Sequence, residues 1–201
     1  DLDRIELRRV DLASLASVRA FTDGVSADHD HLDVIIANAA VMACPQGTTS
    51  DGFETQFGTN HLGHFVLVNR LISRMTGGGR IVTLSSTGHR LSDVDLDDPN
   101  FEHTPYEPWI AYGRAKSANA LFARELARRA GARIRSYSVH PGGIVTDLGR
   151  HLTDELINEM ATFARARSGN TESASSSIGF DFKSVEAGAA ARALGVAAPG
   201  S

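Results

Sequence analysis

The segment LDVIIANAA, residues 32–40, joins a five-residue apolar run to a turn of small residues. A run this short fits a strand that is buried on both faces, as the strands of a parallel sheet are. The segments 5–10, 80–84 and 133–139 predict three further strands.

Helical spacing of apolar residues fills the intervals between these segments. Asp51 and Glu54 resemble a capping box at the start of the longest helical segment, and three glycines at 77–79 follow its end. Strands that alternate with such helices predict one α/β domain built on a doubly wound parallel sheet. The predicted helices are 14–21, 51–75, 109–130, 153–166 and an alanine-rich segment at 185–196.

Four polar or small motifs follow the predicted strands directly. They are Asp11, Asn38, Ser86 and the pair Pro141-Gly142. In a doubly wound sheet, ligands bind beyond the carboxyl ends of the strands. We therefore expect all four motifs to face one crevice.

The composition of the 201 residues narrows the class of protein. A hydrophobic content of 42% supports a buried core and excludes a wholly disordered chain. A formal net charge of −4 argues against a protein that coats nucleic acid or acidic lipid. The single cysteine, Cys44, excludes a disulfide framework and fits a cytoplasmic location, and no apolar run reaches the roughly 20 residues of a membrane span.

Tyr112 and Lys116 lie four residues apart on a predicted helix, so their side chains share a face. A phenol with a pKa of about 10 is a poor acid or base at neutral pH, and a nearby ammonium favours the phenolate. A tyrosine tuned in this way can exchange a proton with a substrate oxygen. The alternative is a surface tyrosine packed along a lysine stem, and the spacing alone does not decide between the two.

Ser86 could orient a substrate oxygen beside that phenol, or it could satisfy a turn. A serine nucleophile is not indicated, because the chain lacks a Gly-x-Ser-x-Gly elbow. Asn60 interrupts an apolar helical stripe, so its side chain needs either backbone partners or a water that links it to the site. No metal site is expected, since no third ligand joins His61 and His64 at a suggestive spacing.

The turn after the run 133–139 contains Gly142, Gly143 and Thr146. Glycines there let the backbone approach a flat or charged ligand, and the threonine can bond to a phosphate or an amide. This signal is weak by itself, because many turns contain Pro-Gly.

Taken together, these motifs resemble those of the short-chain dehydrogenase/reductase family, which implies a Rossmann-like sheet. The phrases FGTNHLGHF at 57–65 and AYGRAKSANALFARELA at 111–127 are most similar to its retinol-dehydrogenase-like and WW-domain-oxidoreductase-like branch. The matching pieces, in the family's order, are Asp11-Leu12, Asn38-Ala39-Ala40, Asn60-His61-Leu62-Gly63, Ser85-Ser86, Tyr112-x-x-x-Lys116 and Pro141-Gly142-Gly143-Ile144-Val145-Thr146.

The resemblance implies four catalytic residues. Tyr112 would be the acid/base and Ser86 would polarise the substrate oxygen. Lys116 would lower the pKa of the tyrosine and hold the nicotinamide ribose, and Asn60 would anchor a water of the proton relay. The implied cofactor contacts are Asp11 and Leu12 at the adenine, Asn38, Ala39 and Ala40 at the adenosine ribose, and Pro141, Gly142, Ile144 and Thr146 at the nicotinamide end, together with Tyr112 and Lys116.

Two features depart from the family pattern. Ala40 stands where the family has glycine, and its methyl group could tighten the ribose pocket. The family also begins with a strand, a glycine-rich phosphate turn, a helix and a second strand, and it ends with a strand after 185–196. We therefore expect residues 1–201 to be a partial domain, incomplete at both ends, in which the strand at 5–10 lacks neighbours and cofactor binding is weak or absent.

The implied activity is hydride transfer between NADP or NAD and an alcohol or carbonyl, with NADP preferred from the branch. An inactive nucleotide-binding scaffold or sensor is the alternative, and the presence of all four catalytic residue types favours an enzyme. We expect the segment 147–182, with a mobile Ser-rich stretch at 168–179, to cover the substrate. Whether the chain forms a homo-oligomer is open. Five apolar residues of this segment suggest a lipophilic substrate, although the ordinary packing of an amphipathic helix gives the same pattern. They are Leu148, Leu152, Leu156, Ile157 and Met160.

Overall fold

A computed structural model of the protein describes residues 5–75, 77–168 and 184–190. The described residues form a parallel sheet in the order β1–β2–β3, made of β1 (Val34–Ala37), β2 (Gly79–Leu84) and β3 (Ile134–Val139). The bounds of the strands lie within two residues of those of the segments that predicted them. The parallel α/β class is thus confirmed.

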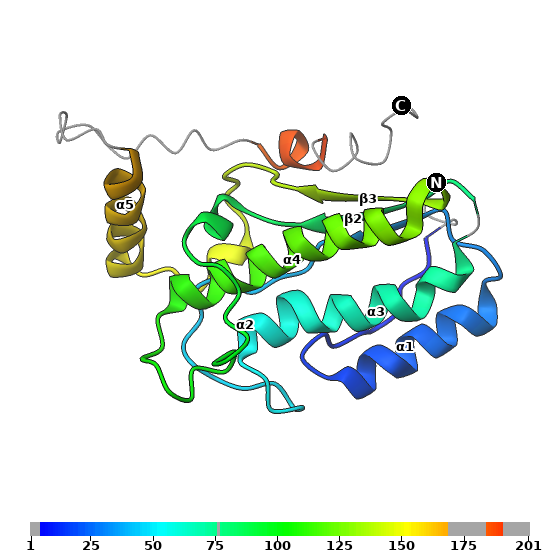
Figure 1. Ribbon diagram of the computed structural model, residues 1–201, viewed down its shortest axis with the longest axis horizontal. Coiled ribbons are helices and arrows are strands. Elements are labelled where there is room, and N and C mark those ends of the chain that lie inside the picture. The colour runs from blue at the N-terminus through cyan, green and yellow to red at the C-terminus, as the bar shows by residue number, and fades with distance from the viewer. Residues whose placement is uncertain (1–4, 76, 169–183, 191–201) are drawn as a thin grey trace.

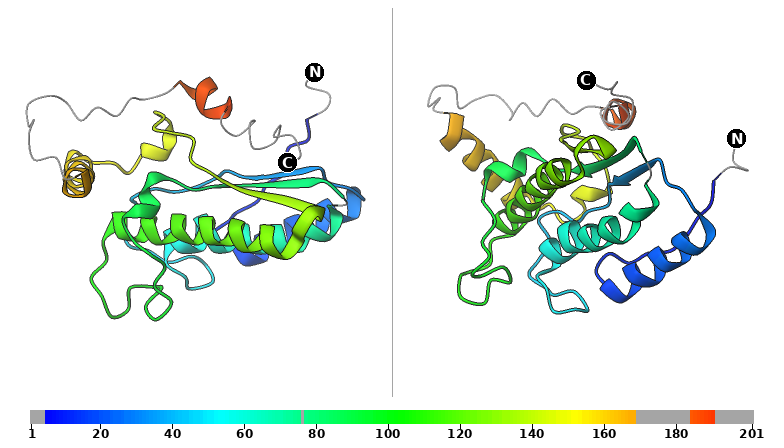
Figure 2. Two further views of the ribbon diagram at one scale, coloured as in Figure 1. Left: turned by 45° about the horizontal axis from the view of Figure 1, so that its top comes forward. Right: turned by 45° about the vertical axis from the view of Figure 1, so that its right-hand side comes forward.

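Three long helices cover one face of this sheet (Figures 1 and 2). They are α1 (Leu15–Asp28), α3 (Gly63–Leu71) and α4 (Pro108–Ala130). The helix α3 lies between β1 and β2 in the chain, and α4 lies between β2 and β3. Both connections lead in the same direction across the sheet. Because crossover connections share one handedness, their helices lie on the same face of the sheet.

The predicted helix at 51–75 is observed as several helical pieces in succession. They are α2 (Thr55–Phe57), a π-helical turn (Gly58–Leu62), α3 and a 3-10 turn (Ile72–Arg74). A π-helical turn inside an α-helix often marks a functional position.

The cap of this helical stretch differs from the predicted capping box. Glu54 is itself the N-cap, and its carboxylate accepts hydrogen bonds from the backbone N–H groups of Gln56 (2.8 Å) and Phe57 (2.6 Å). Asp51 instead accepts from the N–H of Leu15 (2.7 Å) and so binds the first turn of α1. The helix therefore begins later than predicted, because the carboxylate of Glu54 satisfies its free N–H groups.

The core fills the space between the sheet and the three helices. Ile81 and Ile134, on the central and last strands, have no exposed surface. This packing makes the sheet a rigid base for its carboxyl edge. The buried residues of this core are Val25, Ile35, Val68, Leu71, Met75, Ile81, Leu126 and Ile134.

The strand predicted at 5–10 is wrong, because these residues form no strand in the described part of the chain. Ile5 and Leu7, two of the apolar residues that suggested it, are 63% and 92% exposed. Arg8 instead binds the carboxylate of Asp28, the last residue of α1, at 2.8 Å. A strand needs a neighbour that accepts its ladder hydrogen bonds, and none is described beside this segment.

The helix predicted at 153–166 is confirmed as α5 (Asp154–Ser168), which stands in Figure 1 on the side toward which β3 points. Of the alanine-rich segment, residues 185–190 are helical, and 191–196 lie outside the described residues. Nearly all of the Ser-rich stretch also lies outside them. Among the described helices, none combines the length and apolarity needed to cross a membrane.

Candidate active site

The carboxyl ends of the three strands lie at one edge of the sheet. Ala37 pairs with Thr83, and Leu84 pairs with Val139, so the strands end level with one another. Asn38, Ser86 and Pro141 therefore follow the strands at the same edge, which confirms that part of the prediction.

Asp11 does not follow a strand, so the reason given for placing it at this edge is wrong. Its carboxylate accepts a hydrogen bond from the N–H of Ala13 (2.9 Å). The adjacent residue, Leu12, nevertheless lies against the start of α3. A Cβ on Gly63 would stand 2.5 Å from the Leu12 carbonyl oxygen, so the glycine is what permits this approach.

The helix α4 carries Tyr112 and Lys116 on its buried face. Each residue is 3% exposed, and the Lys116 Nζ lies 5.4 Å from the centre of the Tyr112 ring. The alternative of a surface tyrosine is therefore wrong. The shared face predicted from the four-residue spacing is confirmed.

The Ser86 hydroxyl lies beside the phenol of Tyr112, near enough to lower the pKa of the tyrosine. The Ser86 Oγ also accepts from the N–H of Gly88 (3.1 Å) and caps a 3-10 helix, Thr87–Arg90. The turn role of Ser86 is thus confirmed, whereas its role in orienting a substrate oxygen stays a prediction, for which the hydroxyl has a suitable place beside the phenol. In this arrangement the phenol of Tyr112 can exchange a proton with a substrate oxygen while the hydroxyl of Ser86 orients that oxygen.

The pKa of Tyr112 departs from the sequence-based expectation. Burial raises it to about 12, and the nearby Ser86 hydroxyl opposes that rise. Burial also lowers the pKa of Lys116 to about 8. In this structure the exclusion of water outweighs any lowering of the Tyr112 pKa by the ammonium, because desolvation penalises the charged form of each group.

Asn60 lies in the π-helical turn and is fully buried. Its side chain accepts from the N–H of Val41 and donates to the carbonyl of Val41, both at 2.8 Å. Its own carbonyl accepts from the His64 Nδ1 (3.1 Å) and from the Asn119 carboxamide (3.1 Å). Of the two partners that the sequence left open, the side chain takes the backbone, and it fixes the loop that follows Asn38–Ala40.

The end of β2 is joined to α4 by hydrogen bonds of Lys116, Ser85 and Asn119, and of these residues the sequence analysis missed Asn119. The Lys116 Nζ donates to the carbonyl of Leu84 (3.0 Å), and the Ser85 Oγ donates to the carbonyl of Lys116 (2.9 Å). Asn119 also donates to the Leu84 carbonyl (3.1 Å). The spacing of Asn119, seven residues after Tyr112, was the available signal, because it continues the same helix face.

The residues at the strand ends are suited to a nicotinamide cofactor. Asn38 and Ala39 are exposed, and Gly142 has a φ of 94°, a conformation that favours glycine and leaves the backbone uncovered. Lys116 has three ammonium hydrogens and donates to Leu84, so donors remain for ribose hydroxyls. Thr146 is exposed, and its hydroxyl accepts a hydrogen bond from the N–H of Leu148 (3.4 Å).

An apolar cluster lies beside the phenol of Tyr112. The Trp109 Nε1 donates to the carbonyl of Leu156 (2.8 Å), which ties α5 to the first turn of α4. Of the five apolar residues predicted to cover a substrate, three pack in this cluster, while Ile157 is 43% exposed. The cluster consists of Ala43, Trp109 and Tyr112 with Met42, Leu91, Leu152, Leu156 and Met160.

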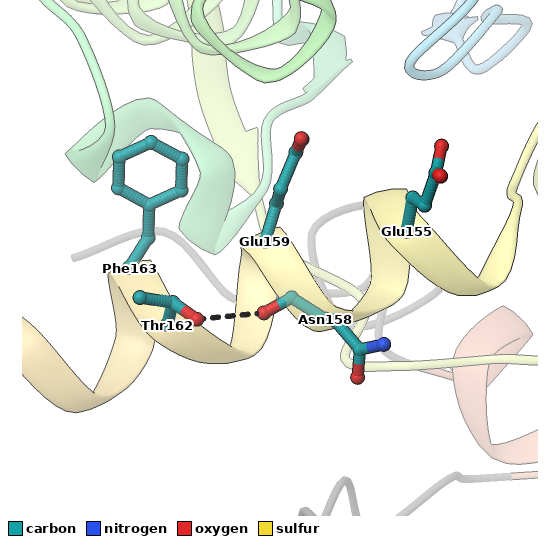
Figure 3. Close-up of a pocket in the computed structure, with 5 residues that line it drawn as sticks. All are labelled: Glu155, Asn158, Glu159, Thr162 and Phe163. Carbon is teal, nitrogen blue, oxygen red and sulfur yellow. Dashed lines mark hydrogen bonds between the residues drawn. The ribbon is translucent and has the colours of Figure 1, made fainter.

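A shallow hollow on α5 does not belong to this site. Its lining residues all come from that helix, as Figure 3 shows, and none is a predicted site residue. The Thr162 hydroxyl donates to the Asn158 carbonyl (2.9 Å), a bond within the helix. Two glutamates on one helix face, without a further observation, do not indicate a ligand. The lining residues are Glu155, Asn158, Glu159, Thr162 and Phe163.

Comparison with known proteins gives matches over most of the chain. A family model described as enoyl-(acyl carrier protein) reductase matches residues 3–180. Retinol dehydrogenase 13 of Homo sapiens is 43% identical over 150 residues, which are 73% of this chain and 45% of that protein. Retinol dehydrogenase 14 of Homo sapiens is 46% identical over 154 residues, 75% of this chain and 46% of that protein. The chain thus spans about half the length of the curated relatives it matches.

Solved structures match as well. A short chain dehydrogenase from Burkholderia cenocepacia J2315 in complex with NADP has a TM-score of 0.64 at 22% identity, with 94% of this chain and 67% of that one covered. A blue fluorescent protein from a metagenomic library in complex with NADPH has a TM-score of 0.56 at 27% identity, with 76% and 58% covered. The similarity to the Burkholderia cenocepacia structure supports the parallel α/β fold of this chain.

Proposed function

Because the chain belongs to the short-chain dehydrogenase/reductase family, in its retinol-dehydrogenase-like branch, we propose that its protein is an oxidoreductase. The reaction is hydride transfer between a nicotinamide cofactor and an alcohol or carbonyl substrate. The observation that carries this proposal is the placement of the buried Tyr112 phenol beside the Ser86 hydroxyl, with Lys116 one helical turn further along the same buried face.

Tyr112 acts as the acid/base in this proposal. The bound nicotinamide supplies or accepts the hydride. In carbonyl reduction the hydroxyl of Tyr112 gives its proton to the substrate oxygen, and in alcohol oxidation the phenolate takes that proton back. Ser86 holds the same oxygen in line with the phenol, which removes the orientational cost of proton transfer.

Lys116 supports the phenolate by its charge and binds ribose hydroxyls with the hydrogens that it does not donate to Leu84. A charge so deeply buried acts strongly, because little water screens it. Asn60 contributes by fixing the loop after β1. Its carbonyl already accepts from His64 and Asn119, so a relay water there would share that oxygen.

NADP is the proposed cofactor, with NAD as the alternative. Support comes from the branch and from the NADPH-bound neighbour at 27% identity. A cytoplasmic location also stays a proposal, supported by the single cysteine. The proposed cofactor contacts are Asp11, Leu12, Asn38, Ala39, Ala40, Tyr112, Lys116, Pro141, Gly142, Ile144 and Thr146.

The proposed substrate carries an apolar group. The apolar cluster of Trp109, Leu152, Leu156 and Met160 lies next to Tyr112, so a substrate oxygen at the phenol would place the rest of the molecule near these side chains. The names of the relatives, retinol dehydrogenases, agree with a lipophilic alcohol.

The proposal is tested with Tyr112→Phe in the full-length protein, supplied with NADPH or NADH and a panel of carbonyl compounds. Loss of one acid/base group is expected to lower kcat about 100-fold or more, while the ring keeps its packing. Tyr137→Phe, on β3, is the matched control and should keep its activity. Turnover that is insensitive to Tyr112→Phe would remove the acid/base role, and cofactor binding without any turnover in the unchanged protein would favour the scaffold.

A further inference from the structure

The side chain of Asn119 joins the π-helical turn to the end of β2. Its carboxamide nitrogen donates to the carbonyls of Asn60 and Leu84, each at 3.1 Å, and the residue is 3% exposed. These two acceptors are more than 20 positions apart in the sequence and belong to different elements. Asn119 is therefore the direct polar link between them.

The orientation of this carboxamide is fixed from its other side. The carboxamide oxygen lies 3.0 Å from the His61 Nδ1. Because an amide oxygen can accept but not donate, the imidazole carries a hydrogen on Nδ1 and donates it. Both hydrogens and the oxygen of Asn119 are thus engaged.

Lys116 shares one of these acceptors. Its Nζ donates to the Leu84 carbonyl at 3.0 Å, so the ammonium and the carboxamide bind the same oxygen. The titratable groups that face Lys116 are Tyr112 on its own helix and His64 on α3, which interacts with the lysine charge. The surroundings of the ammonium therefore depend on how the Leu84 carbonyl is held.

We propose that Asn119 is a positioning residue that acts through Lys116. It holds the carbonyls of Asn60 and Leu84 together, and thereby fixes the Lys116 ammonium beside Tyr112 and limits the acceptors open to it. The consequence for turnover rests on the proposed function, whereas the effect on Lys116 itself does not.

The direct test follows the titration of Lys116 by NMR in protein labelled at the lysine ε-carbon. The chain contains two lysines, Lys116 and Lys183, so the resonance that Lys116→Met removes identifies the signal. Asn119→Ala is compared with Asn69→Ala. Asn69 is a matched control, because its carboxamide donates to the Phe65 carbonyl (2.8 Å) at an exposed position of α3.

Asn119→Ala is expected to raise the pKa of Lys116 by about one unit from its lowered value, which is a tenfold change in the ionisation constant. Removing the carboxamide frees two carbonyl oxygens and admits water, and both favour the ammonium. Asn69→Ala should leave the titration unchanged. If Asn119→Ala does not fold, the titration is measured in Asn119→Ser, because the serine hydroxyl can donate a hydrogen bond to one of the two carbonyls. An unchanged Lys116 titration in a folded Asn119 variant would overturn the proposal.

Activity gives a second readout through a double-mutant cycle. Asn119→Ala is expected to lower kcat about tenfold in the unchanged protein and to have little further effect in a Lys116→Met background, because coupled residues are not additive. Equal effects in both backgrounds would show that Asn119 acts apart from Lys116. If Tyr112→Phe fails to change turnover, the proposed function fails, yet the NMR titration still decides on Asn119.

Discussion

Gly88 lies directly against the ring of Tyr112. A Cβ on Gly88 would stand 2.8 Å from the Tyr112 Cδ1 and 2.9 Å from the Cε1, closer than side-chain atoms approach one another. The same Cβ would lie 3.4 Å from the Ser86 Oγ. The absence of a side chain at Gly88 therefore sets where the phenol rests relative to Ser86.

Gly88→Ala is expected to displace the Tyr112 ring, because the ring is buried against Trp109 at a centroid distance of 6.1 Å and has little room to move. We expect a fall in kcat/KM of roughly 10- to 100-fold, since small displacements of a reacting group are costly. Overpacking should also lower the free energy of unfolding by about 1–3 kcal/mol. Steady-state kinetics and chemical denaturation measure the two effects.

Gly77→Ala is the matched control for that substitution. A Cβ on Gly77 meets no atom within 4 Å, so neither kinetics nor stability should change. Kinetics and stability of Gly88→Ala equal to those of the unchanged protein would contradict the geometric argument.

The three strands of the sheet were predictable from the local sequence, because each contains apolar residues that become buried. The segment 32–36 (LDVII) is apolar at every position but one, whereas 80–84 (RIVTL) and 133–139 (RIRSYSV) place apolar and β-branched residues among polar ones, a mixture that strands also accept. The run at 5–10 failed because a strand also needs a hydrogen-bonding neighbour, which is a non-local condition. The local sequence pattern therefore identifies candidate strands, but it does not predict which of them pair in a sheet.

The site was predictable in its residue types and less so in its chemistry. The four-residue spacing placed Tyr112 and Lys116 on one face of α4, because helix geometry is local. The raised pKa of the tyrosine depends on burial by distant elements, which the spacing cannot report. For the same reason Asn119 was missed: its partners, Asn60 and Leu84, approach it when the sheet and helices pack.

His64 is expected to make the protein sensitive to acid. Burial lowers its pKa to about 4, against an unfolded value of 6.5. Between these two pH values the unfolded chain binds more protons than the folded one, so stability is lost as the pH falls from about 6.5 through 4. The loss amounts to roughly 3 kcal/mol. Urea denaturation at a series of pH values measures it.

His64→Asn separates this effect from other titrations. The asparagine can still donate to the Asn60 carbonyl but does not ionise, so between pH 7 and pH 4 it should gain stability relative to the unchanged protein. His103→Asn, at an exposed loop position, should leave the pH dependence as it is. A His64→Asn protein with the original acid dependence would show that another group causes it.

The bond between Trp109 and the carbonyl of Leu156 predicts how substrates are held. Trp109→Phe removes the indole donor and keeps an aromatic ring against Tyr112, so α5 loses its polar tie to α4. We expect KM for long-chain apolar carbonyls to rise about 5- to 10-fold, because one hydrogen bond contributes roughly 1 kcal/mol, while kcat and the KM of short carbonyls change little. Asn158→Ala, exposed on the same helix, is the control. An equal change in KM for long and short substrates would mean that α5 does not contact the substrate chain, because a lost contact with that chain affects long substrates selectively.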